Sequence, residues 1–312
     1  LIDQAVTAFM PYFIHPDGSV GGFYGSRSTK IVYPAGFALN IRHHPIARSC
    51  LEAILNGLKS GSVPCPADLD FENSFRVATS YLLAADACSK IDDNYELPLL
   101  PCERSDVYKV FPEAGLSVYG FQAYYAVVSH KKGGAFTVYD KKQRELLLDD
   151  RGFLVHVRGQ LASSSGDNGH SEFSDKNNVQ ILNDFTLVKN EQMTPAKFLI
   201  LLVLGFTAFH FKFLLKKLKV LLARRLITGI KTVGGQLKRT IQFTPDKIVV
   251  NDEVSLPKGS EISTTIRTST TQPIHMASCD FYSPPAKAGD LNVISETQQI
   301  NDRKLKSSYI IT

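Results

Sequence analysis

The chain contains no tryptophan and only five cysteines among its 312 residues. No two cysteines form a CxxC pair or the spacing of a metal site, and their odd number argues against a disulfide framework. We therefore expect Cys50, Cys65, Cys88, Cys102 and Cys279 to be buried free thiols. The sequence also lacks a Walker-type loop, an HExxH helix, a GxSxG elbow and a dinucleotide-binding fingerprint. It predicts neither a cofactor nor a metal site.

Acidic residues are missing from one long window, Gln192 to Pro245. The formal net charge of the chain is +5 and this window holds ten bases, so the remainder carries a net charge of −5. The bases are Lys197, Lys212, Lys216, Lys217, Lys219, Arg224, Arg225, Lys231, Lys238 and Arg239. A basic balance confined to one segment does not indicate a nucleic-acid partner.

Within this window, residues 194–230 combine an apolar run with a basic helical face. The run ends at Lys212, so it is shorter than the roughly 20 residues needed to cross a bilayer. A crossing would also separate strands of similar type, so we disfavour spanning. Two interpretations stay open: an amphipathic helix on an anionic membrane surface, or a helix packed on the strands with a solvated basic face. The membrane-binding residues would be Phe198, Phe206, Phe209, Phe211, Lys212, Lys216, Lys217, Lys219, Arg224 and Arg225.

The sequence changes character near Pro101, from helical to strand patterns. Leu1 already lies in what looks like the middle of a helix, so we expect further helical sequence upstream. Residues 1–100 are predicted as a helical domain with loops rich in Gly and Pro. The segments with helical character are 1–14, 35–40, 45–59 and 69–88.

Short β-branched and aromatic runs dominate the chain after Pro101. Turn segments separate them, which is typical of an antiparallel meander, and residues 163–178 predict a polar loop. Residues 101–312 are therefore predicted as a layered antiparallel β-sandwich with the helical insert 194–230, and the chain as α+β. The expected strands are 107–111, 115–119, 123–129, 135–139, 145–148, 153–157, 179–188, 239–243, 247–251, 262–269, 291–294 and 307–311.

A glycine-rich loop in the helical part, residues 17–29, is the best candidate for chemistry. Glycines let the backbone approach a ligand closely. Eliminative cleavage of a uronate needs a base, an acid for the leaving oxygen and a group that neutralises the carboxylate. The residue types present predict Tyr24 and His43 as the catalytic pair, and substrate contacts from Arg27, Asn40, Arg42 and His44. The alternative is a structural turn, with Tyr24 packed and Arg27 paired.

Three polar segments of the β part receive structural interpretations. The run Asp149–Gly152 predicts a hairpin turn. His130, beside two lysines, predicts the tip of a loop. The segment Gly166–Glu172, with Asp175, offers oxygen ligands without the spacing of a calcium loop, so a solvated loop is favoured.

Several segments share their pattern with one known family. They are Phe111–Tyr119, His130–Tyr139 and Leu148–Phe153 in the β part, and Asp17–Gly22 and Tyr24–Arg27 in the glycine-rich loop. They resemble the heparinase II/III-like proteins, and the resemblance covers most of the chain outside the insert. It implies the C-terminal part of an incomplete α/α toroid followed by a layered antiparallel β-sandwich. The implied activity is eliminative cleavage of acidic, uronate-containing polysaccharides.

The chain departs from that family in one segment. Catalytic members usually carry a His-rich, Asp-containing stretch where this chain has His130–Asp140 with a single His. Two functions therefore stay open. One is a lyase of acidic polysaccharide, with its cleft between toroid and sandwich. The other is a non-catalytic polysaccharide-binding or scaffolding protein at a membrane surface, in polysaccharide assembly or export, which would place it peripherally on a membrane or in the periplasm or cell envelope.

Overall fold

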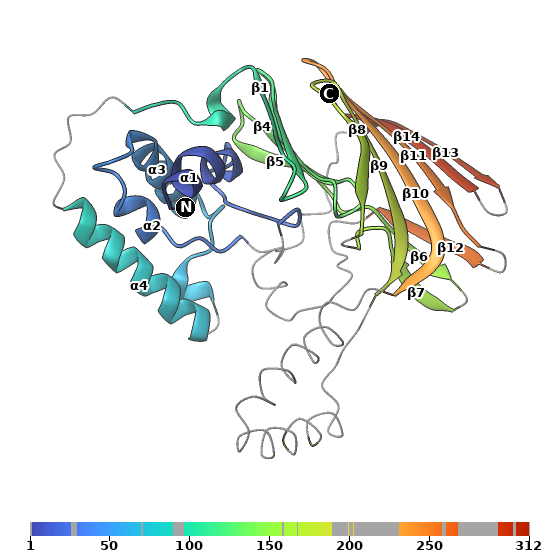
Figure 1. Cartoon of the computed structure of the whole chain (residues 1–312), viewed down its shortest axis with the longest axis horizontal. Helices are drawn as coiled ribbons and strands as arrows, with labels where there is room; N and C mark the ends of the chain where they lie inside the picture. Colours follow the sequence, from blue (N-terminus) through green and yellow to red (C-terminus); the bar gives the residue numbers. More distant parts are fainter. Residues whose placement is uncertain are drawn as a thin grey trace.

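The computed structural model describes residues 2–25, 30–69, 71–89, 97–157, 159–166, 168–188, 199, 202, 231–257, 260–267, 293–301 and 304–311. In these residues a few short helices precede two antiparallel sheets, so the predicted α+β class is confirmed. The elements form three layers: the helices, a five-stranded sheet, and a nine-stranded sheet that curls like half of a barrel (Figure 1). No α/α toroid is evident in the described part of the chain.

The helical layer contains two long helices, α3 (Pro45–Ser60) and α4 (Phe71–Cys88), which confirm two of the predicted segments. Proline suits the first position of α3, and Gly61, with a φ of 82°, ends this helix in the left-handed conformation. The predicted helical segment 1–14 is helical over residues 2–13 but is divided into three short pieces, and the last of them contains Pro11, which cannot continue an α-helix. The short helices are α1 (Ile2–Gln4), η1 (Ala5–Phe9), η2 (Met10–Phe13), α2 (Ala35–Ala38), η3 (Pro66–Asp68) and η4 (Pro101–Glu103).

The five-stranded sheet is an antiparallel meander. In spatial order its strands are β1 (Val107–Phe111), β2 (Leu116–Gly120), β3 (Tyr124–Ser129), β4 (Ala135–Asp140) and β5 (Glu145–Asp150), close to the predicted positions. Every residue of β2 and β3 is buried. This sheet is the middle layer, and its central strands are covered on both faces, which explains why β2 and β3 lack the usual alternation of apolar and polar residues.

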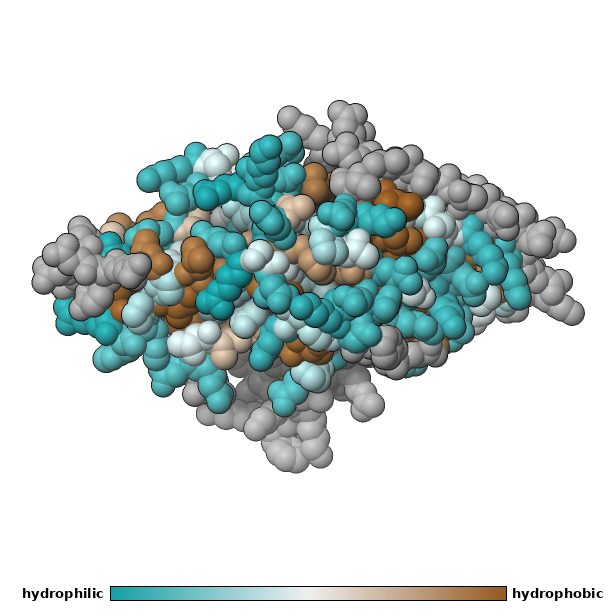
Figure 2. Space-filling model, turned by 90° about the horizontal axis from the view of Figure 1, so that it is seen from above, coloured by the Kyte–Doolittle hydropathy of each residue, from teal (hydrophilic) through white to brown (hydrophobic). Residues whose placement is uncertain are grey.

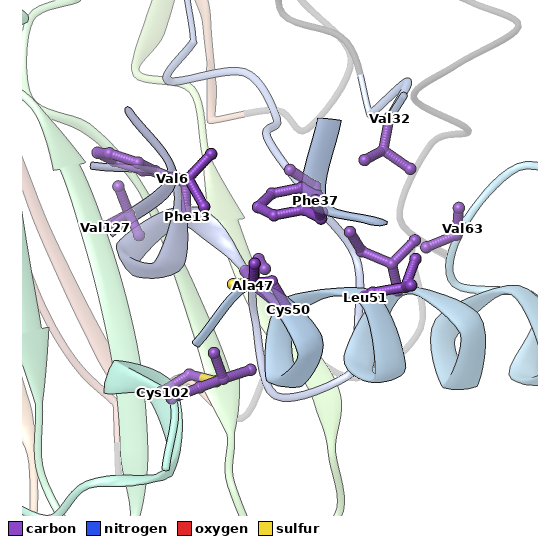
Figure 3. Close-up of a cluster of buried hydrophobic side chains, with 14 of the residues drawn as sticks. Val6, Phe13, Val32, Phe37, Ala47, Cys50, Leu51, Val63, Cys102 and Val127 are labelled. Carbon is purple, nitrogen blue, oxygen red and sulfur yellow. The ribbon is translucent and has the colours of Figure 1, made fainter. Parts of the chain in front are cut away.

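One apolar core joins the helices to the five-stranded sheet. Figure 3 shows Val6 and Phe13 beside Val127 of β3, with Ala47 and Leu51 along α3. Residues from both sides of Pro101 therefore pack together, and the division into domains at that point stays a prediction.

Two of the expected buried thiols, Cys50 and Cys102, belong to this core. Burial raises the pKa of both thiols to about 12, so they are unreactive. Cys65 is exposed and Cys88 is half-buried, contrary to the expectation, and Cys279 lies outside the described residues.

The nine-stranded sheet is built entirely from strands that follow the first sheet in the sequence. In spatial order its strands are β12 (Ser260–Arg267), β6 (Phe153–Val157), β7 (Gln160–Ser163), β9 (Asn178–Leu187), β10 (Thr232–Phe243), β11 (Ile248–Ser255), β14 (Lys304–Ile311) and β13 (Val293–Asn301), and β8 (His170–Ser174) pairs with β9. Each strand predicted after residue 150 overlaps with one of these strands. The short strands β7 and β8 were not predicted, and β8 replaces part of the expected polar loop 163–178.

The curl of this sheet produces two further apolar cores. One lies between the sheets and contains Tyr119, Phe136 and Val138 with Ile241 and Phe243. The other lies inside the curl, where β6 faces β9, β10 and β11 through Phe153, Val155, Phe185, Leu237 and Val254. The two sheets thus pack as layers, and one of them also packs against itself.

The run Asp149–Gly152 is not a hairpin turn. Its first half ends β5 in the five-stranded sheet, and the chain then crosses to β6 in the nine-stranded sheet. Gly152 has a φ of 87° and its N–H donates to Asp150 Oδ1 at 2.7 Å. This bond between Gly152 and Asp150 is typical of a turn, but β6, the strand that follows, pairs in the nine-stranded sheet and not with β5, so no hairpin forms.

A buried charge cluster connects the two sheets at this crossing. Arg239 of β10 donates to both carboxylate oxygens of Asp252 on β11, at 2.7 and 2.9 Å, and to those of Asp150 on β5, both at 3.2 Å. Tyr309 of β14 also donates to Asp150, and Arg239 donates to the carbonyl of Gly134 at 3.1 Å. We call these four side chains, Arg239, Asp150, Asp252 and Tyr309, the Arg239 cluster.

The surface is mixed. The face in Figure 2 is mainly hydrophilic, with separate apolar patches at the helical end, near the centre and toward the sheets. On α4, Phe71, Phe75 and Leu82 are exposed, and their spacing places them on one face of the helix.

Leu199 and Leu202 of the insert 194–230 are described, and both are helical and exposed. The rest of the insert, with all of its predicted membrane-binding residues, lies outside the described residues. Among the helices that the structure describes, none has the length and apolar character to cross a membrane.

We predict that Arg239→Met lowers the free energy of unfolding by about 3–5 kcal/mol, because it leaves two buried carboxylates without their counter-charge. Urea denaturation measures this loss. Lys238→Met, at the adjacent exposed position, is the control and should change stability by less than about 0.5 kcal/mol. Equal, small effects of the two substitutions would show that the cluster does not hold the sheets together.

Candidate functional site

The glycine-rich loop begins with a tight turn that is fixed against α3. Ile14 pairs with Val20, and the His15 N–H donates to the Ser19 carbonyl at 3.0 Å. Gly18 has a φ of 81°, and a Cβ there would lie 2.3 Å from the carbonyl oxygen of Ala53. Only glycine fits this position. The turn therefore places His15 and Ser19 in a defined orientation.

A chain of hydrogen bonds runs through this turn to Tyr24. The Ser19 hydroxyl donates to Asp17 Oδ1 at 2.6 Å, and Ser19 Oγ lies 2.9 Å from His15 Nδ1. His15 Nε2 lies 2.7 Å from the Tyr24 hydroxyl. Because the Ser19 proton is committed to Asp17, we assign the His15 proton to Nδ1, and Tyr24 then donates to Nε2. Hydrogen-bond donation therefore runs in one direction, from the Tyr24 hydroxyl through His15 and Ser19 to the Asp17 carboxylate.

The His15 ring rests on the five-stranded sheet. It stacks on Tyr139 of β4 with ring centroids 4.2 Å apart and an interplanar angle of 13°. Tyr24 contacts the edge of the same imidazole and also packs on Phe13. The pair therefore lies at the junction of the helical layer and the sheet.

Burial keeps both members of the pair neutral. It lowers the pKa of His15 well below its ordinary value, assisted by the charge of Lys30. Burial also raises the pKa of Tyr24 well above its ordinary value, and the carboxylates of Asp17 and Asp149 add to this rise. Near neutral pH the resting pair consists of imidazole and phenol, and a proton can move between them only together with another proton transfer.

Two cations hold the loop onto the sheet. Lys132, in the turn between β3 and β4, donates to the carbonyls of Phe23 and Gly25 at 2.5 and 2.6 Å. Its ammonium group lies 4.7 Å from the centre of the Phe23 ring, and the Arg151 guanidinium lies 5.0 Å from it. Arg151 in turn donates twice to Asp149 Oδ2, at 2.9 and 2.8 Å.

The structure places the predicted site residues in two groups. Tyr24 belongs to the hydrogen-bond chain and is only 5% exposed. Asn40, in the turn after α2, donates to the Gly36 carbonyl, His44 contacts Asp3, and Arg42 and His43 are exposed. No hydrogen bond or ring contact joins Tyr24 to His43 within the described ranges, and Arg27 lies outside them. The roles of all these residues stay predictions.

The residue that sequence reasoning missed is His15. It stands directly before Pro16-Asp17-Gly18, outside the glycine-rich loop 17–29 from which the site residues are predicted. The signal was the turn itself, because a tight His–Pro–Asp–Gly–Ser turn brings the imidazole next to the serine and the aspartate.

His130 lies in the turn between β3 and β4, which confirms the predicted loop tip. It is buried, and its Nε2 lies 2.9 Å from the hydroxyl of Ser117 on β2. Burial lowers the pKa of His130 to about 4. The imidazole at this loop tip is therefore a neutral part of the interior.

No cluster of His, Cys, Asp or Glu suited to a metal ion occurs in the described residues. Asp175, one of the oxygen groups considered for a cation, accepts the N–H groups of Asn177 and Asn178 at 2.7 Å each and so caps a turn. Asp167 lies outside the described residues.

A scan of the chain against models of protein families found no match, and a comparison with curated proteins found no similar sequence. The resemblance to heparinase II/III-like proteins therefore enters below as a proposal.

We predict that stability falls between pH 6.5 and pH 4 because of His130. Its ordinary pKa of 6.5 applies to the unfolded chain, and burial lowers the pKa to about 4 in the folded chain. Between these values only the unfolded chain binds the proton, so the contribution is complete above pH 6.5 and is lost as the pH falls. The loss amounts to about 3 kcal/mol.

Urea denaturation at several pH values tests this prediction. His130→Gln should show a flatter dependence of stability on pH than the natural chain, because glutamine does not titrate. His43→Gln, at an exposed histidine, is the control and should leave the profile unchanged. An unchanged profile for His130→Gln would assign the acid sensitivity to other groups.

Proposed function

We propose that the chain is a heparinase II/III-like protein that cleaves an acidic, uronate-containing polysaccharide by β-elimination. The observation that carries the proposal is the 2.7 Å contact between the Tyr24 hydroxyl and His15 Nε2, within a hydrogen-bond chain that ends at a carboxylate. A tyrosine whose proton has a prepared acceptor can take part in proton transfer at carbon.

The proposed step begins at the carbon that carries the uronate carboxylate. The Tyr24 oxygen takes the proton from this carbon while its own proton moves to His15 Nε2. The electron pair of the broken C–H bond forms the ring double bond, and the bond to the leaving glycosidic oxygen breaks. Tyr24 then gives a proton to that oxygen and recovers one from His15, so the pair returns to its neutral state.

Ser19 and Asp17 orient and stabilise the imidazole in this scheme. Ser19 accepts from Nδ1–H, which leaves Nε2 free to receive the tyrosine proton. The Asp17 carboxylate, one hydrogen bond further away, favours the transient positive charge on the ring. Arg27 keeps its predicted role of neutralising the substrate carboxylate, with Asn40, Arg42 and His44 as further substrate contacts.

The proposal includes the fold of the heparinase II/III-like family. We interpret the helices as the C-terminal part of an incomplete α/α toroid, and the two sheets as the layered β-sandwich of that family. The position of Tyr24 at the junction of helices and sheet supports this interpretation, because the family places its cleft there.

The alternative is a non-catalytic polysaccharide-binding or scaffolding protein at an anionic membrane surface. The burial of Tyr24 favours it, since a tyrosine held by His15 and covered by its own loop also serves to fix that loop. In this case the protein binds saccharide without creating unsaturated ends, and the insert 194–230 supplies the contact to the membrane.

We predict that Tyr24→Phe lowers the rate of elimination at least about 100-fold, because it removes the group that exchanges protons with the substrate. The protein is incubated with galacturonate, guluronate, mannuronate and glucuronate polymers, and the ultraviolet absorbance of the unsaturated product is followed. Tyr33→Phe, at an exposed tyrosine, is the matched control and should retain full activity.

His15→Gln and His43→Ala separate the two candidate partners of Tyr24. The geometry predicts a large loss for the first and a small one for the second. Full activity of Tyr24→Phe would refute the proposed site. Saccharide binding without any unsaturated product would support the scaffold function instead.

A further inference from the structure

Three buried polar atoms on one face of the five-stranded sheet have no hydrogen-bond partner in the described part of the chain. They are Thr137 Oγ1 and Tyr139 Oη of β4, and Asp149 Oδ1 of β5. Burying a polar atom without a partner is costly, and native proteins rarely do it. Three such atoms together indicate a group that binds there.

The register of the sheet places these three residues close together on one face. Thr137 and Asp149 are direct cross-strand partners, and Tyr139 lies two residues along β4 on the same face. The intervening Val138 and the neighbouring Leu148 belong to the core between the sheets. The polar face therefore points the other way, toward the helices and the His15 ring that stacks on Tyr139.

Tyr139 differs from the other buried tyrosines of this sheet. Tyr119, Tyr124 and Tyr125 each donate to a backbone carbonyl, of Asp175 at 3.2 Å, Thr244 at 2.7 Å and Tyr12 at 2.7 Å. Ser19 lies near enough to the Tyr139 hydroxyl to offset part of its raised pKa, but no hydrogen bond of full geometry joins them. The hydroxyl of Tyr139 is therefore available to a ligand.

The charges around the three atoms define the kind of group that fits. The Asp149 carboxylate disfavours a second carboxylate, while Arg151 and Lys132 disfavour an ammonium group. Arg151 donates two hydrogen bonds to Asp149 Oδ2, and Asp149 Oδ1 accepts none among the described residues. A group that donates to a carboxylate oxygen and accepts from two hydroxyls is a neutral alcohol.

We infer that Thr137, Tyr139 and Asp149 form a subsite for a hydroxyl group of a sugar ring, next to Tyr24. The inference rests on the proposed function, because it assigns the ring hydroxyls of the same saccharide to this face. The hydroxyl donates to Asp149 and accepts from Thr137 and Tyr139.

The ligand enters when the loop that covers the face moves. That loop, residues 15–25, is fastened at its end by Lys132 through the carbonyls of Phe23 and Gly25. Lys132→Met removes these bonds and should speed association with saccharide without weakening the contacts of the subsite.

The test compares Thr137→Val and Tyr139→Phe with a matched control, Tyr125→Phe. Tyr125 is the cross-strand partner of Tyr139, but its hydroxyl is already bonded to Tyr12. Calorimetry measures the affinity for uronate oligosaccharides and for neutral galactan oligosaccharides, and urea denaturation measures stability. We expect each subsite variant to bind about tenfold more weakly. Its denaturation midpoint should be unchanged or higher, whereas Tyr125→Phe should bind normally and unfold more easily.

The outcomes separate this inference from the proposed function. If the natural chain binds and cleaves uronates and both subsite variants bind equally well, only the subsite is refuted. Clear destabilisation of both variants with normal binding would assign the three atoms to a buried water and refute it as well. If galactan binding is lost in the variants and no uronate is ever cleaved, the subsite stands and the lyase function fails. Absence of all saccharide binding refutes both.

Discussion

The contact on which the rest of the fold depends is the bonding of one guanidinium to two carboxylates in the interior. Arg239 lies along β10 between Leu237, in the core inside the curl, and Ile241, in the core between the sheets. The rings of Phe136 and Phe153, one from each core, lie 5.8 and 5.7 Å from its guanidinium. The cluster thus forms a polar layer between two apolar ones. Burying these charges is favourable only if every partner is present, so the layer fixes how the two sheets meet.

This constraint also positions the candidate site. Asp150 must face Arg239, and successive residues of a strand point to opposite faces. Asp149 therefore faces the helices, where its charge acts on Tyr24 and Tyr139. Arg151 follows, stacked on Phe23 of the loop. The alternation of side chains along β5 thus places Asp150 in the Arg239 cluster on one face and Asp149 at the candidate site on the other.

Sequence patterns predicted the strands well because burial and turn residues repeat locally, and they located the loop that holds Tyr24. They did not predict the roles of residues whose contact partners lie far away in the sequence. Arg239 was counted with the basic window, although its partners Asp150 and Asp252 lie 89 and 13 residues away. Asp149–Gly152 was interpreted as a hairpin because turn chemistry does not reveal which sheet the next strand joins. His15 was missed because its partner Tyr24 is brought to it by a bend that only the packing of Gly18 against α3 defines.

The neutral state of the Tyr24–His15 pair has a consequence for the chemistry that this site can support. A buried phenolate or imidazolium would each be unstable alone, so neither can be stored before a substrate arrives. In the proposed elimination, proton transfer would therefore be coupled to bond breaking in the substrate, with the loop docked while it occurs. Lys132 provides that docking from the turn between β3 and β4, and Arg151 from the crossing to β6. The sheets thus hold the pair in the environment that keeps it neutral, and in the proposed reaction they would act in this way without contacting the substrate carboxylate.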